Sequence, residues 1–116
     1  MDNYKFSTLE YKRPDLEAYR ALLIQWKAAV EHAESYAALR ELIFEIDRKN
    51  CELFTQYSIA HIRHTLDTRD EFYEAEIGYL QDTMPTLSGD SVALSEAIAS
   101  SPFRADIENE FGKQYF

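Results

Sequence analysis

The longest helical pattern in the chain lies in residues 36–66, which read YAALRELIFEIDRKNCELFTQYSIAHIRHTL. Their apolar residues recur every three or four positions, a spacing that places them on one face of an α-helix. Ser35 directly precedes the stretch and has a side chain suited to capping its first turn. Roughly 31 residues at about 1.5 Å each predict a rod about 46 Å long. The stripe consists of Leu39, Ile43, Ile46, Leu53, Tyr57 and Ala60, with Asn50 in its gap.

The preceding segment carries a second stripe of the same kind, which predicts a helix over about residues 14–33. Pro14 suits a first helical turn, and Asp15 and Glu17 suit the positive end of the helix dipole. Because the connection to Ser35 is short, we expect the two helices to form an antiparallel hairpin. The members of this second stripe are Leu16, Tyr19, Leu23, Trp26 and Val30.

A third long helix is predicted over about residues 69–99. Thr68 and Glu71 have the spacing of a capping box, in which each side chain accepts a hydrogen bond from the backbone of the other. Pro85 is expected to kink this helix, because proline has no backbone N–H to donate. Residues 88–91, Ser-Gly-Asp-Ser, are a second candidate for a break. We therefore expect the third helix to be either kinked or broken.

Two shorter segments flank the long helices. Residues 1–13 precede Pro14 and are expected to be extended, since a residue before proline is disfavoured in the helical region. Near the other end, Pro102 suits a first helical position and predicts a short helix over residues 102–111. Gly112 then provides a natural helix stop.

The composition agrees with a single helical domain over residues 1–116. Apolar residues make up 46% of the chain, and Gly and Pro are scarce at three each, which favours a few long elements. The predicted fold is therefore all-α. It consists of an antiparallel hairpin of long helices, a third long helix and a short C-terminal helix, preceded by an extended segment.

The net negative charge of the chain argues against partners that are themselves strongly negative. The net charge is −9, from 21 acidic and 12 dispersed basic residues, so no basic patch is present for a phosphate backbone or an anionic headgroup. We therefore expect no nucleic-acid partner and no membrane partner. The sequence also lacks a signal-peptide pattern and any apolar run near the ~20 residues that span a bilayer. Cys51 is the only cysteine, which is compatible with a reducing compartment. With no signal peptide and no membrane span, the expected location is cytoplasmic.

The familiar motifs of catalysis and cofactor binding do not occur in the sequence. Its three glycines are too scattered for a phosphate-binding loop, and no His is followed by Glu, so the H-E-x-x-H zinc motif is absent. A Glu-x-x-His pair, which marks di-iron helical bundles, is also absent. We therefore expect this chain alone to carry no complete catalytic site and no cofactor.

Residues 57–67 combine apolar positions with polar side chains and contain neither Lys nor Glu. We expect the polar residues here to be at least half buried. A buried polar group needs a partner, because leaving one unpaired costs about 1–3 kcal/mol. The spacing of four allows Arg63 to pair with Asp67, with Asp70 as another candidate. The candidate residues of this group are His61, Arg63, His64, Asp67 and Asp70.

Three interpretations of this group stay open. It can be a structural polar network, or it can form the wall of a substrate or partner cleft. The third interpretation is a metal site at His61, His64 and Asp67, because nitrogen and oxygen ligands at helical spacing suit zinc. At about 100° per residue these three side chains spread over about 120° of the helix surface, so a metal would need a further ligand from elsewhere.

Aromatic residues indicate where a partner could bind. Trp26 lies in the stripe of the first helix, and this stripe is either core or a partner-binding face. Tyr115 and Phe116 follow the helix stop, where aromatic side chains have little function unless another segment covers them. These three residues are the predicted partner or interdomain face. The aromatic end also indicates a chain that belongs to a longer protein.

Three pieces of the sequence carry a family resemblance, and they keep the order and spacing of that family. They are Tyr11-Lys-Arg-Pro-Asp-Leu16; Ile62-Arg-His-Thr-Leu-Asp-Thr-Arg-Asp-Glu-Phe-Tyr73 with Glu76; and Ser101-Pro-Phe-Arg104 followed by Phe111-Gly-Lys-Gln-Tyr-Phe116. In these pieces the chain resembles the N-terminal part of oligoendopeptidase F-type zinc metallopeptidases, which are relatives of thimet oligopeptidase.

The resemblance implies the N-terminal helical domain of a larger peptidase, in which zinc within a deep channel cleaves short peptides. Family members hold this zinc with an H-E-x-x-H helix and a later Glu, none of which occurs here, so no catalytic or metal residue carries over. The implied function is a scaffold or channel wall, with the remaining catalytic domain as partner and short peptides as substrates of the parent enzyme. The alternative is a freestanding helical-hairpin module for protein interaction.

Overall fold

The computed structural model describes residues 10–112, and the regular secondary structure in that range is entirely helical. The all-α prediction is therefore confirmed for the described part of the chain. Of the predicted extended segment, residues 10–13 have no regular secondary structure, and residues 1–9 lie outside the described range. The helices are α2 (Leu16–Glu31), α3 (Tyr36–Leu66), α4 (Glu71–Thr83), the 3-10 turn η1 (Met84–Leu87), α5 (Ser88–Ala99) and α6 (Arg104–Phe111).

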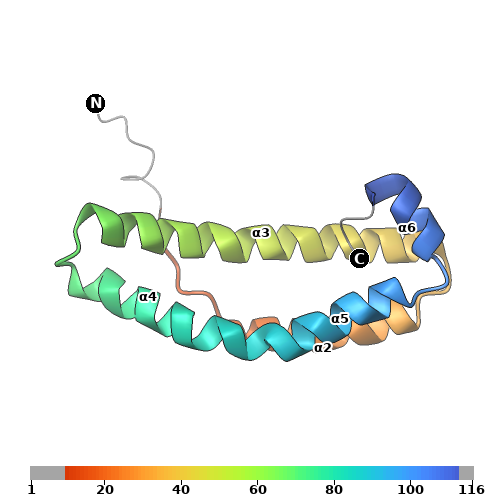
Figure 1. Ribbon diagram of the computed structural model, residues 1–116, viewed down its shortest axis with the longest axis horizontal. Helices are drawn as coiled ribbons and strands as arrows, with labels where there is room; N and C mark the ends of the chain where they lie inside the picture. The colour runs from red at the N-terminus through yellow and green to blue at the C-terminus, as the bar shows by residue number, and fades with distance from the viewer. Residues whose placement is uncertain (1–9, 113–116) are drawn as a thin grey trace.

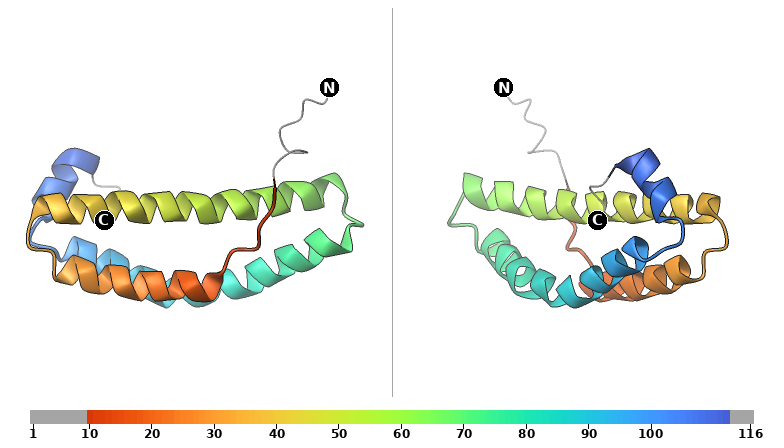
Figure 2. Two further views of the ribbon diagram at one scale, coloured as in Figure 1. Left: turned by 180° about the vertical axis from the view of Figure 1, so that it is seen from behind. Right: turned by 45° about the vertical axis from the view of Figure 1, so that its right-hand side comes forward.

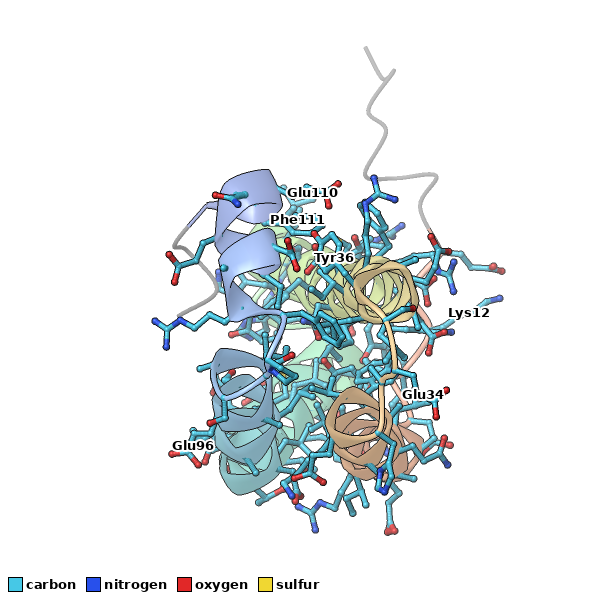
Figure 3. The ribbon with its side chains drawn as sticks, turned by 90° about the vertical axis from the view of Figure 1, so that its right-hand side faces the viewer. Lys12, Glu34, Tyr36, Glu96, Glu110 and Phe111 are labelled. Atoms are coloured by element: carbon cyan, nitrogen blue, oxygen red, sulfur yellow. The ribbon has the colours of Figure 1, made fainter. Side chains whose placement is uncertain are left out.

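The helices form an elongated bundle that measures 51 × 31 × 19 Å. α3 runs along one side of the molecule, and α2 and the α4–η1–α5 segment run along the other (Figure 1). α2 and α5 pack side by side, whereas α4 packs on α3 (Figure 2). α6 lies beside the beginning of α3 and above α5 (Figure 3). α3 is the longest of these helices and runs along most of the bundle.

α2 and α3 form the predicted antiparallel hairpin, and each helix begins at a side-chain cap (Figure 1). The Asp15 carboxylate accepts a hydrogen bond from the backbone N–H three residues later at 3.0 Å. α2 therefore starts at Leu16 and ends at Glu31, within the predicted range, and Pro14 lies before it. The Ser35 hydroxyl oxygen likewise accepts from a backbone N–H at 3.2 Å, and α3 covers the residues expected of it.

The inner face of α3 is the apolar stripe seen in the sequence. Its gap at Asn50 is filled by a hydrogen bond, because the Tyr19 hydroxyl of α2 donates to the Asn50 side-chain oxygen. Both partners are half buried, so this bond satisfies polar groups inside the α2–α3 contact. Tyr57 is also half buried, and the fully buried members of the stripe are Leu39, Ile43, Ile46, Leu53 and Ala60.

The third predicted helix is divided at Pro85, which lies at the start of the 3-10 turn η1. Because proline cannot donate to the carbonyl four residues earlier, the α-helical ladder stops there. α4 ends at Thr83 and α5 begins at Ser88. Residues 88–91 do not break the helix, since they form the first turn of α5. The bend lets α4 contact α3 while α5 contacts α2.

The start of α4 differs from the predicted capping box. The cap is Asp70, whose carboxylate accepts from the backbone N–H groups of Phe72 at 3.0 Å and Tyr73 at 3.4 Å. Thr68 instead lies in the turn between α3 and α4, which a bond from the Asp70 N–H to the Asp67 carbonyl closes at 3.1 Å. The turn therefore moves the helix start two residues beyond the predicted one.

α6 also starts two residues later than predicted, at Arg104, because the Ser101 hydroxyl binds the backbone N–H of Phe103 at 3.1 Å in a turn. It ends at Phe111, and Gly112 follows with a φ of 83°, a conformation that favours glycine.

One core joins all the helices. Its most deeply buried side chains come from three of them, α3, α4 and α6. Among the described residues, no helix has both the length and the apolar content needed to cross a bilayer. The largest fully buried side chains are Leu39, Ile43, Leu80 and Ile107.

Candidate functional site

The predicted polar residues lie at the tip of the molecule where α3 turns into α4, and the structure divides them into local groups. His61 is exposed, and its ring stacks on Tyr57 with 6.2 Å between the ring centroids. Arg63 is half buried, and its guanidinium carbon lies 6.0 Å from the centre of the Tyr73 ring. This cation–π contact joins α3 to α4. His64 is half buried as well.

The two aspartates of the group bind backbone at the α3–α4 turn. Asp67 accepts hydrogen bonds from Arg69, from its backbone N–H at 3.0 Å and from its Nε at 3.3 Å. Asp70 caps α4 as described above. Among residues 10–112 the ion pair of Asp67 is therefore with Arg69, where the sequence had favoured Arg63. Both aspartates are thus engaged in forming the turn.

The structure brings together a different polar cluster, formed by Tyr11, Arg13, Glu76 and Tyr79. Glu76 is 5% exposed, and its carboxylate accepts from the Tyr11 hydroxyl at 2.8 Å. The same carboxylate forms a two-pronged contact with Arg13, at 3.0 Å to Nε and 2.7 Å to Nη2. The Arg13 guanidinium carbon also lies 3.9 Å from the centre of the Tyr79 ring. These contacts fasten the segment before α2 to α4.

The electrostatics of this cluster follow from its geometry. The hydrogen bonds from Arg13, and then from Tyr11, hold the pKa of Glu76 below its usual value, although burial alone would raise it. The bond to Glu76 raises the pKa of Arg13, and burial together with the Glu76 carboxylate raises the pKa of Tyr11. Glu76 is therefore charged at neutral pH and acts as an anchor for its donors.

Aromatic contacts extend this cluster over the first turn of α4. The Tyr11 ring lies edge-on to Phe72, at 6.3 Å between centroids, and to Tyr73, at 5.8 Å. The sequence reasoning missed the cluster as a site, although Tyr11, Arg13 and Glu76 all lie in the pieces that carry the family resemblance. The pairing itself leaves no local signal, because 63 residues separate Arg13 from Glu76.

A second cluster joins the beginning of α3 to α6 (Figure 3). The Tyr36 hydroxyl donates to Glu110, and Arg40 Nε binds the same carboxylate at 2.6 Å. Desolvation and the Glu110 contact raise the pKa of Tyr36 to about 12, while the bonds from Tyr36 and Arg40 lower the pKa of Glu110. Next to them, the rings of Phe44 and Phe111 meet edge-on with their centroids 5.5 Å apart.

Trp26, the one residue of the predicted partner face that the structure describes, lies in the core. Trp26 is 2% exposed and donates its indole N–H to Glu45 at 2.7 Å, so it ties α2 to α3 inside the core. A buried indole with its donor satisfied is not available on a surface. Tyr115 and Phe116 lie outside the described residues.

A metal site is not assembled within residues 10–112, where no group of three or more His, Cys, Asp or Glu side chains is placed to hold an ion. His61, His64 and Asp67 do not converge, and Asp67 instead binds Arg69. The zinc that the family resemblance implies for the parent enzyme therefore has no set of ligands among these residues.

These features define an all-helical domain in which polar clusters make contacts between separate segments of the chain. Its family follows from comparison with known sequences. Residues 6–116 match the family described as the Peptidase M3 N-terminal domain, and the chain belongs to this family.

Two solved structures share the fold over almost the whole chain. A crystal structure described as an oligoendopeptidase F is 37% identical, with a TM-score of 0.89, over 97% of this chain and 20% of that chain. PZ peptidase A, solved with an inhibitor, is 35% identical with the same TM-score and the same coverage. The chain thus spans 20% of the length of each of these peptidases. No curated protein sequence gives a significant match.

Proposed function

We propose that this domain is a non-catalytic wall of a zinc-dependent oligoendopeptidase that hydrolyses short peptides. The observation that carries the proposal is the match to an oligoendopeptidase F, at 37% identity over 97% of this chain. The zinc ligands and the catalytic groups would come from the remaining portion of the peptidase. The family match favours this function over a freestanding interaction module.

The structure of the domain suits a supporting role. Two of its ion pairs hold separate segments together, Arg13 with Glu76 and Arg40 with Glu110. His61, Arg63 and His64 are proposed to face either the catalytic portion or the peptide channel, since partly exposed polar groups can serve both. Cys51 is a free, exposed thiol, which is compatible with the reducing cytoplasm that we propose as the location.

The test uses a chimeric peptidase in which this chain replaces the N-terminal domain of the oligoendopeptidase F relative. We expect the chimera to hydrolyse a fluorogenic short peptide, to lose activity with a metal chelator and to regain it with zinc. The isolated 116-residue chain is expected to hydrolyse nothing under the same conditions, with or without zinc. A folded chimera without activity, or hydrolysis by the isolated chain, would overturn the proposal.

A further inference from the structure

One side of α3 remains uncovered by the described helices beyond the contact with α6. Tyr36, Arg40 and Phe44, spaced four residues apart, face α6. Residues on the same face continue at three- and four-residue steps along the helix. We call this continuation the outer stripe, and it consists of Asp47, Cys51, Phe54, Thr55, Ser58 and Ile62.

The outer stripe differs in composition from the solvated side of the same helix. It lines a shallow hollow along α3, and Asp47 is its one charged member. Phe54 is 58% exposed, and Leu66, one turn past the stripe, is 73% exposed. Neither Lys nor Glu occurs on the stripe, and of the other side chains that are depleted from interfaces it has only Asp47 and Ser58. The charged residues on the other sides of α3 include Glu41, Glu45, Arg48, Lys49 and Glu52.

The last residue of α6 lies at the beginning of the stripe. Phe111 contacts Phe44 at the beginning of the stripe, and Gly112 then ends α6. The fold shared with both related peptidases covers 97% of the present chain but only 20% of each peptidase. The other 80% of each peptidase lies outside this fold. That large remaining portion needs a contact surface on the domain, and the stripe continues a contact that α6 already makes.

We propose that the outer stripe of α3 is the surface on which the catalytic portion of the peptidase packs. The inference rests on the proposed function, and it adds which face of the domain is used. The occupant is an apolar surface of the catalytic portion, which covers Phe54 and Ile62 and excludes water from Cys51. Burial of these side chains supplies a non-directional driving force for the association.

The natural position of Cys51 gives a direct probe of this packing. The labelling rate of its thiol with a maleimide is measured in the isolated chain and in the chimera, with the other cysteines of the chimera replaced. We expect the thiol to react readily in the isolated chain and at least about tenfold more slowly in the chimera, because reaction then requires local opening. The control is the Ile24→Cys variant in a Cys51→Ser background, since Ile24 on α2 is 56% exposed. Its thiol is expected to react equally fast in both proteins.

A matched pair of substitutions tests whether the apolar side chains of the outer stripe stabilise its contact with the catalytic portion. Phe54→Asp and Ile24→Asp change residues of almost equal exposure, 58% and 56%. Both are expected to leave the thermal midpoint of the isolated chain unchanged. In the chimera, Phe54→Asp is expected to lower the thermal midpoint and expose Cys51 to labelling, whereas Ile24→Asp changes neither.

The outcomes separate this inference from the proposed function. An active chimera in which Cys51 labels as fast as in the isolated chain, and in which both substitutions act alike, overturns the docking surface alone. An isolated chain that is dimeric by light scattering, and monomeric with Phe54→Asp, would assign the stripe to a second copy and also overturn it. A folded but inactive wild-type chimera removes the proposed function and this inference with it.

Discussion

At the scale of single residues, Glu76 shows how a buried charge can be retained in a small helical domain. Transfer of a carboxylate from water is unfavourable unless charged and hydrogen-bonding partners replace the lost solvation. Arg13 supplies the charge and Tyr11 a further donor, and both come from the segment before α2. The lowered pKa of Glu76 is the expected consequence of these contacts.

We predict that Glu76→Gln destabilises the isolated chain by about 1–2 kcal/mol at neutral pH, because the amide cannot provide the charge that Arg13 faces. This loss is smaller than that from breaking a fully buried ion pair, because the Arg13 side chain is 52% exposed and water screens the pair. Urea unfolding followed by circular dichroism measures the change. Glu74→Gln, at an exposed position on the same helix, is the control and is expected to stay within about 0.5 kcal/mol of the unsubstituted chain.

The same substitution should change how stability depends on pH. A carboxyl whose pKa is lower in the folded state stabilises the fold above its unfolded pKa, here a value of 4.5, and loses this contribution as the pH falls through the folded value. The Glu76→Gln variant is therefore expected to lose less stability between neutral and acid pH than the unsubstituted chain. Equal acid sensitivity of the two proteins would show that the Glu76 cluster is not bound as described.

At the scale of helices, the boundaries are set by caps and by one proline. Asp70 and Ser35 accept backbone N–H groups that an isolated helix end would leave unsatisfied. Pro85 ends the α-helical ladder and introduces η1. The turn at residues 67–70 shows that a capping motif in sequence can be displaced by a neighbouring acidic residue, since Asp70 takes the cap position from Thr68.

We predict that Asp70→Ala destabilises the isolated chain by about 1 kcal/mol, because the first turn of α4 loses its acceptor and a charge favourable to the helix dipole. Thr68→Ala is the matched comparison and is expected to change the free energy of unfolding by less than about 0.5 kcal/mol. Denaturant titrations of both variants measure the difference. A larger effect from Thr68 than from Asp70 would restore the capping box predicted from sequence.

At the scale of the whole molecule, a single core joins α2, α4, α5 and α6 to α3. Leu80 of α4 is among the least exposed side chains, together with Leu39 of α3 and Ile107 of α6. The bend at η1 allows α4 to pack on α3 and α5 on α2 at the same time. Loss of core volume should therefore weaken the bundle as one unit.

We predict that Leu80→Ala destabilises the isolated chain by about 2–4 kcal/mol, the sum of lost apolar burial and a residual cavity. Leu66→Ala removes the same number of atoms from a side chain that is 73% exposed, and it is expected to change stability by less than about 0.5 kcal/mol. Thermal unfolding of both variants measures the contrast. Similar losses from the two substitutions would contradict the placement of the core.

The helices of this protein could be predicted from local sequence because their apolar spacing and their caps involve residues within a few turns of one another. The stripe from Leu39 to Ala60 and the cap at Ser35 are examples. Contacts between distant segments could not be predicted in this way. The binding of Arg13 to Glu76 across 63 residues, the hydrogen bond that joins Tyr19 to Asn50, and the burial of Trp26 all depend on which helices meet. The same applies to His61, which faces solvent in this chain because no described helix packs over it. A local pattern specifies which residues share a face, but burial of that face depends on the segment that packs against it.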